Sequence, residues 1–134
     1  MRFVIAYLAT AVVFLALDAL WLSQLALGIY RRELGSLLLD SPNLAVAGLF
    51  YLIFILGLVF LAVLPGVDAG SWWRALWMGA LLGLVAYGTY DITNLSTLRG
   101  WSLTVTVLDL AWGTALSAVA ATAGYVAVAA FGAR

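Results

Sequence analysis

The sequence predicts an all-α integral membrane protein, folded as a four-helix bundle with short loops. Composition supports this class, because 66% of the 134 residues are hydrophobic, only 9% are charged, and the mean hydropathy is +1.15. These values lie outside the range of soluble domains. Four apolar runs cover residues 3–29, 44–64, 73–94 and 101–131, and each can cross a hydrocarbon core of ~30 Å at ~1.5 Å per residue. We therefore expect residues 1–134 to form a single transmembrane domain.

The first two runs are interpreted as retained membrane helices. Arg2 precedes the run 3–29, as a basic residue does in signal peptides, but this run is too long and Asp18 interrupts it. The run 44–64 is followed by Pro65 and Gly66, a pair that predicts the end of a helix.

Tryptophans mark the beginnings of the third and fourth runs. Trp72, Trp73 and Trp77 lie at the start of the third run, and Trp101 starts the fourth. Indoles at these positions are typical of the interfacial belt of membrane proteins. They support helices at 73–94 and 101–131.

Small residues recur every four positions in these two runs, a spacing that favours close helix packing. We expect this packing within the chain, with a homodimer or a larger membrane complex as the alternative partners. The two rows are Ala75, Gly79 and Gly83, and Gly113, Ser117 and Ala121.

Several chemistries are excluded by absent residue types. The chain has no cysteine, histidine or lysine, so disulfides, thiolate or histidine metal sites, Schiff bases and a histidine base are ruled out. An oxygen-only metal site usually needs six or more ligands, so we expect no metal and no cofactor. The net charge is zero, which gives nucleic acid no electrostatic footprint.

The numbers of arginines on the two sides of the membrane do not decide the orientation of the chain. Three fall on each side of the expected bundle, and we expect a multi-pass protein with cytoplasmic termini. The two sets are Arg2, Arg74 and Arg134, and Arg31, Arg32 and Arg99.

Three acids lie inside apolar sequence, where each costs about 2.5–3.5 kcal/mol to insert at a helix centre. Asp18 precedes Tyr30 by about 18 Å of helix, Asp109 follows Trp101 by about 12 Å, and Asp91 lies near the end of the third helix. Because successive helices alternate in direction, we expect the three acids to converge in one polar pocket in the same half of the bilayer. Glu33, Asp40 and Asp68 fall in expected loops and are interpreted as surface charges.

The neighbours of these acids at helical spacing are polar or aromatic. Tyr87, Asp91 and Asn94 form one stripe, with Tyr90 beside it. Trp21 and Trp112 each follow an aspartate by three residues; a pocket wall and simple packing both explain them. Asn94 and Ser102 are equally consistent with helix caps.

Arg99 is the base of the loop that follows this stripe. Its planar guanidinium suits either Asp91 or an anionic headgroup. We expect it to cover the mouth of the pocket.

The fragments L-D-x-x-W-L in the first helix, YGTYDITN in the third and LDLAWG in the fourth together resemble a widespread bacterial family of small predicted membrane proteins of uncharacterised function. The resemblance covers essentially the whole chain. It implies a four-helix inner-membrane protein and assigns no reaction, substrate or cofactor. It maps the family pattern onto Asp18, Trp21, Tyr87, Tyr90, Asp91, Thr93, Asn94, Asp109, Trp112 and Gly113.

Three functions remain open. The first is an Asp-lined pocket that binds or acts on an amphipathic, lipid-like molecule, and acid–base isomerisation would suit its side chains. The second is proton-linked transport or a channel formed by an oligomer. The third is an accessory or structural subunit of a larger membrane complex. Candidates for ligand binding or proton exchange are Asp18, Trp21, Tyr87, Tyr90, Asp91, Asn94, Arg99, Asp109 and Trp112.

Overall fold

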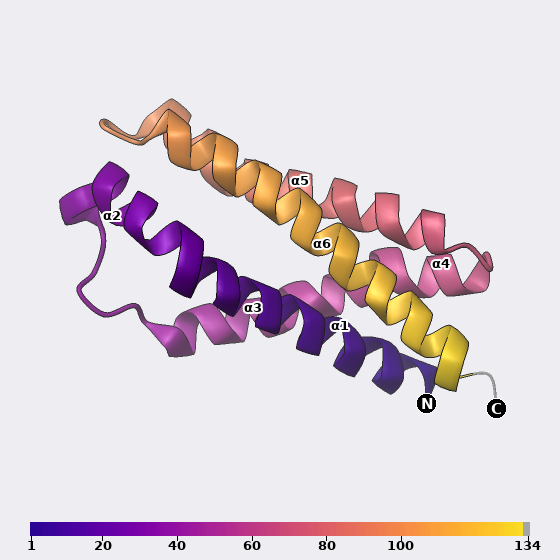
Figure 1. The fold of residues 1–134 in the computed structure, drawn as a ribbon. Helices are drawn as coiled ribbons and strands as arrows, with labels where there is room; N and C mark the ends of the chain where they lie inside the picture. Colours follow the sequence, from indigo (N-terminus) through magenta and orange to yellow (C-terminus); the bar gives the residue numbers. More distant parts are fainter. Residues whose placement is uncertain (133–134) are drawn as a thin grey trace.

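The computed structural model describes residues 1–132, which form four helical rods joined by short loops (Figure 1). The first rod contains α1 (Arg2–Leu20), a π-helical segment η1 (Trp21–Ala26), α2 (Leu27–Leu34) and a 3-10 turn η2 (Gly35–Leu37). The second contains α3 (Leu44–Leu58), a π-helical segment η3 (Val59–Val63) and α4 (Leu64–Asp68). The third and fourth are α5 (Trp72–Thr97) and α6 (Leu103–Phe131). All four rods are long and apolar enough to span a membrane, which confirms the predicted fold class.

The second rod does not end at Pro65 as predicted, because α4 continues to Asp68. Proline normally clashes with the carbonyl four residues before it in an α-helix. Here the π-helical segment η3 ends just before Leu64 and Pro65, and the Leu64 N–H donates to the Val59 carbonyl five residues back. The wider turn leaves room for the proline ring, so the helix passes through Pro65.

Charged residues near the rod ends also differ from expectation. Glu33 lies within α2, and Asp68 is the last residue of α4, so neither belongs to a loop. Arg2 donates to Asp68 at 2.7 Å, with both side chains about half exposed. This pair ties the start of α1 to the end of α4. Arg134, one of the arginines in the charge comparison, lies outside the described residues.

The α5–α6 interface is the most extensive contact between helices, and small residues bring the two backbones together. A Cβ atom added to Gly79 would lie 2.7 Å from the Ala121 Cβ, and one added to Gly83 would lie 2.7 Å from the Ser117 Cβ. Gly113 lies directly under the Tyr87 ring. The two small-residue rows therefore serve packing within the chain.

The cavity of this protein arises from uneven packing of the second rod. Its later part, η3 and α4, packs against α5 and α6, whereas α3 packs mainly against α1. Figure 1 shows α3 diverging from α5 and α6 toward the end of the bundle where α2 lies. The hydrophobic core is continuous on the other side of this divergence and includes Phe14, Ile55, Leu58, Val59, Val63 and Leu116.

Serine and asparagine side chains cap the starts of three helices. The Ser102 hydroxyl accepts a hydrogen bond from the Val105 N–H at 3.1 Å, so its capping role is confirmed. Ser102 also donates to Glu33 at 2.9 Å, which joins α6 to α2. Asn94 does not end its helix, since α5 continues to Thr97.

Candidate functional site

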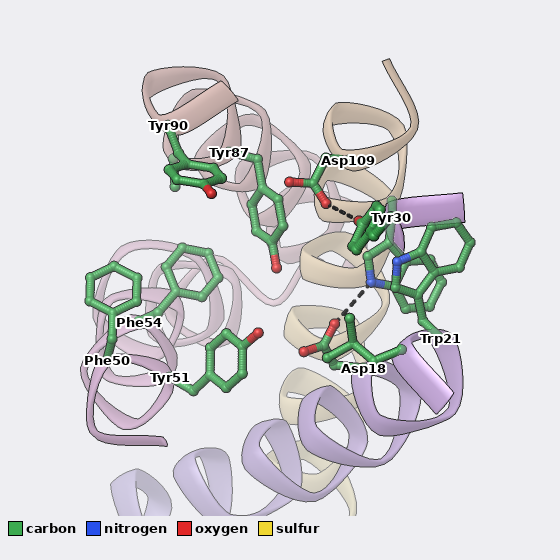
Figure 2. A pocket seen from close by; sticks show the side chains of 12 residues that line it. Asp18, Trp21, Tyr30, Phe50, Tyr51, Phe54, Tyr87, Tyr90 and Asp109 are labelled. Atoms are coloured by element: carbon green, nitrogen blue, oxygen red, sulfur yellow. Dashed lines mark hydrogen bonds between the residues drawn. The ribbon is translucent and has the colours of Figure 1, made fainter. Parts of the chain in front are cut away.

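A cavity of about 440 Å³ lies within the membrane-spanning region, in the space between α3 and the other rods. Its volume falls in the range of small-molecule sites, about 300–1,000 Å³. Figure 2 shows the lining side chains pointing into it from the first, second, third and fourth rods. The lining residues are Asp18, Trp21, Leu22, Tyr30, Phe50, Tyr51, Phe54, Ala86, Tyr87, Tyr90, Asp109 and Trp112.

Asp18 and the two deep tryptophans form the first polar wall of the cavity. The Trp112 indole N–H donates to Asp18 Oδ1 at 3.1 Å. Trp112 also stacks on Trp21, with ring centroids 4.7 Å apart and planes 9° from parallel. The two D-x-x-W motifs, one on each of two distant segments, thus meet in space and share their contacts. These two indoles therefore pack against each other and also line the pocket.

Asp109 and Tyr30 form the second polar wall. The Tyr30 hydroxyl donates to Asp109 Oδ1 at 2.5 Å, which joins α2 to α6 (Figure 2).

The π-helical segment η1 explains how Tyr30 reaches the same cavity as Asp18. Twelve residues of uninterrupted α-helix at about 100° per residue would place these two side chains about 120° apart around the axis. A π-helical turn takes up about one extra residue, which reduces the separation to about 20°. The widened turn therefore positions the phenol on the same wall as the carboxylate.

Asp91 lies beside Asp109 in the α5–α6 interface rather than in the cavity wall. Gly83 faces Ser117 and Tyr87 faces Gly113, so each step of four along α5 matches a step of four back along α6. The next step places Asp91 opposite Asp109, and the two carboxyl groups are neighbours. Asp91 is fully buried, and neither of its oxygens has a hydrogen-bond partner within residues 1–132.

The cavity changes from exposed and aromatic to buried and acidic along its length. Phe50 and Tyr90 are 59% and 56% exposed, whereas Asp18 is 5% exposed. Figure 2 shows Phe50, Phe54 and Tyr90 on one side of the space and Asp18 on the opposite side. Because Phe50 lies on α3 and Tyr90 lies on α5, the exposed rim faces outward between these two helices, where lipid would surround the protein.

The structure brings six of the nine sequence-derived site residues into the cavity wall, and the remaining three lie outside it. Asp91 is behind Asp109, and Asn94 lies one turn further along α5. Arg99 is exposed in the turn after α5, and the described residues contain no acid in an ion pair with it. The six wall residues are Asp18, Trp21, Tyr87, Tyr90, Asp109 and Trp112.

Four of the eight aromatic residues that line the cavity were not predicted from the sequence. In the sequence, Tyr30 served only to mark the end of the first run, one residue before Arg31. In the structure, its hydroxyl donates a hydrogen bond to Asp109. Phe50, Tyr51 and Phe54 lie on α3, a helix that is apolar on all sides. The spacing of these three rings, at i, i+1 and i+4, was the signal that they share a face.

Charge and metal chemistry restrict what the site can hold. None of the described residues that line the cavity is positively charged, although two are aspartates. Residues 1–132 contain no group of three acids that could hold a metal ion. The arrangement therefore offers carboxylate oxygens, phenol hydroxyls and aromatic faces to a ligand.

A family model described as "Predicted membrane protein (DUF2177)" matches residues 3–126. The match covers nearly the whole chain, so the chain belongs to this family of membrane proteins. No curated protein and no solved structure matches the chain.

Proposed function

We propose that this DUF2177 protein binds an amphipathic, lipid-like molecule in the cavity between its helices. The polar group of the ligand lies near Asp18 and Asp109, and its apolar part leaves between α3 and α5 into the bilayer. The observation that carries this proposal is the direction of the cavity, from a rim of exposed aromatic rings to the buried Asp18 and the partly buried Asp109. An amphipathic molecule matches that sequence of environments, because each of its two parts meets a wall of similar polarity.

The intramembrane acids support a binding role rather than a packing role alone. Acids within membrane helices are costly, and they commonly mark ligand or ion sites. Asp18 and Asp109 each receive one hydrogen bond from an aromatic side chain, which fixes the carboxylate toward the cavity. Figure 2 shows the hydroxyl groups of Tyr51 and Tyr87 directed into the same space. Binding and acid–base conversion of the bound molecule use the same groups.

The test is to identify what co-purifies with the protein when it is extracted with its surrounding membrane in polymer nanodiscs. Ala86 lines the cavity, so Ala86→Phe should fill part of it and reduce the bound molecule severalfold. Ala111 is exposed on α6, and Ala111→Phe is the matched control, with retention expected. Equal content of every membrane molecule in the two variants and the native protein would overturn the proposal.

Proton-linked transport is the second candidate, and the fully buried Asp91 opposite Asp109 favours it. A protonatable acid deep in a bundle can exchange its proton for a cationic solute. Uptake into proteoliposomes that depends on a proton gradient and is lost in Asp91→Asn would support transport. If no solute shows gradient-dependent uptake and the bound lipid is retained, transport is refuted and the binding function stands.

The proposed setting is the inner (cytoplasmic) membrane of a bacterium, with membrane lipid as the partner and cytoplasmic termini. The chain contains no cysteine, so single cysteines can be introduced in the loops at Ser41 and Ala69 and labelled with an impermeant reagent. Labelling of the Ser41 position alone in intact spheroplasts is the expected result. The reverse pattern would place the termini outside.

A further inference from the structure

We infer that the polar group of the bound molecule is an organic cation, an amine or a quaternary ammonium, held between aromatic rings and the carboxylates of Asp18 and Asp109. This inference rests on the proposed function, since it names the chemical class of that ligand's head. It follows from the charges and the rings of the cavity wall.

Charge is the first step of the argument. Asp18 and Asp109 line the cavity, with Asp91 adjacent, and no described lining residue carries a positive charge. The chain has no lysine or histidine, so arginine is the remaining side-chain partner for an acid. Arg31, Arg32 and Arg99 are exposed at the end of the bundle nearest the cavity, and Arg2 pairs with Asp68 at the other end. A ligand cation would neutralise carboxylates that the protein's own bases do not, whereas an anionic head would add like charge.

The aromatic rings are the second step. Eight of the twelve lining residues are tryptophan, tyrosine or phenylalanine. Rings packed around one space attract a cation to their faces, and cages of this kind recognise quaternary ammonium groups. The stacked pair Trp21 and Trp112 forms the wall beside Asp18, so the same corner of the cavity contains both a negative charge and large ring surfaces.

The hydrogen bonds of the wall are the third step. Asp18 and Asp109 each use Oδ1 to accept a bond from Trp112 and Tyr30 respectively. Tyr51 lies beside the Asp18 carboxylate and Asp91 beside that of Asp109. An amine can donate to the remaining lone pairs of both carboxylates, and a quaternary ammonium needs no acceptor at all. An inorganic metal ion fits less well, because hard cations take six or more oxygen ligands and aromatic rings supply none.

The experiment compares three molecules that share a dodecyl chain and differ in head charge. The protein is purified in dodecyl maltoside, which is neutral, with Trp72, Trp73, Trp77 and Trp101 replaced by phenylalanine so that emission reports Trp21 and Trp112. Dodecyltrimethylammonium and dodecyl sulfate are titrated separately at low mole fraction in the micelle. We expect the cation to bind about tenfold or more tightly than the sulfate, and Asp18→Asn with Asp109→Asn to abolish the difference.

A second variant keeps the inference testable if loss of both acids prevents folding. Tyr51→Leu removes one aromatic face of the wall, together with the hydroxyl that lies beside Asp18. It should weaken cation binding about two- to fivefold and leave the sulfate response unchanged. The control is Phe60→Leu, which changes a ring that is 54% exposed and outside the cavity.

The outcomes separate the two proposals. Equal or tighter binding of the sulfate, blocked by Ala86→Phe, would overturn the cation while the binding function stands. Both proposals would be overturned if neither probe changes the emission and if Ala86→Phe co-purifies with the same amounts of membrane molecules as the native protein. Dodecylphosphocholine distinguishes the sources: tight binding of it indicates a phospholipid headgroup, whereas tight binding of dodecyltrimethylammonium alone indicates a free amphipathic cation.

Discussion

The contact between Gly113 and Tyr87 predicts a large effect of a single methyl group. A Cβ atom added to Gly113 would lie within 2.5 Å of three atoms of the Tyr87 ring. Ordinary van der Waals contact begins at about 3.4 Å, so the nearest ring atom must move by about 1.2 Å, the difference between 3.4 Å and its distance of 2.2 Å. Tyr87 lines the cavity, and the movement would displace both the α5–α6 interface and the cavity wall.

We expect Gly113→Ala to lower the free energy of unfolding by about 1–3 kcal/mol, the usual cost of overpacking a tight interface. The better helix propensity of alanine, up to about 1 kcal/mol, opposes this loss only partly. The measurement is unfolding in mixed micelles of dodecyl maltoside and sodium dodecyl sulfate, followed by circular dichroism. Binding of the dodecyl probe should weaken in parallel, because the same ring is displaced.

Gly57→Ala is the matched control, since a Cβ atom there meets nothing within 4 Å. It should leave stability unchanged or raise it by less than about 1 kcal/mol. In the Gly113→Ala background, Tyr87→Ala removes the obstructing ring and should restore part of the lost stability. If Gly113→Ala proves as stable as Gly57→Ala, the close approach of the two helices at this level is wrong.

Three further predictions concern polar groups at different depths. Asp91 is fully buried and its two oxygens have no hydrogen-bond partner within the described residues, an environment that disfavours a charged carboxylate. Infrared spectra in lipid at pH 7 should therefore show a protonated-carboxyl band that Asp91→Asn removes, and an identical band in the variant would contradict a proton on Asp91. Tyr30→Phe deletes the donor to Asp109 and should cost about 1–3 kcal/mol in the same unfolding assay, so a neutral result would argue against that hydrogen bond. Asp68→Asn breaks the exposed pair with Arg2 and should change stability by less than about 1 kcal/mol, whereas a larger loss would show that the pair matters more than an exposed one normally does.

The membrane fold and the depth of the acids could be predicted from the sequence because both depend on position along a helix. Composition and run length determine which segments span the bilayer, and a rise of about 1.5 Å per residue places Asp18 and Asp109 at similar depths. Ser102 was recognisable as a cap from its place before an apolar run. These features need no knowledge of how the helices pack.

The cavity itself could not be predicted, because it depends on which faces of apolar helices touch. The helix α3 is apolar all round, so no amphipathic pattern indicates that Phe50, Tyr51 and Phe54 face a space rather than lipid. The divergence of α3 from α5 is a tertiary feature, and the widened turns η1 and η3 are local departures from the regular α-helix. They rotate side chains away from the positions that a regular 3.6-residue period gives, and this is why Tyr30 appeared to be no more than a boundary marker.

Asp18 and Tyr30 line the same cavity because the π-helical segment between them takes up about one extra residue. In this segment, the removal of one residue and the loss of the π-helical turn therefore compensate for each other. A homologue whose first rod is a regular α-helix would need one residue fewer between the acid and the phenol to keep both on the same wall. A single-residue gap in an alignment at Trp21–Ala26 would then preserve the cavity, while a substitution that straightens the helix at constant length would turn the phenol away from it. Deletions within a membrane helix ordinarily rotate everything beyond them, but here a deletion is the change that leaves the site in register.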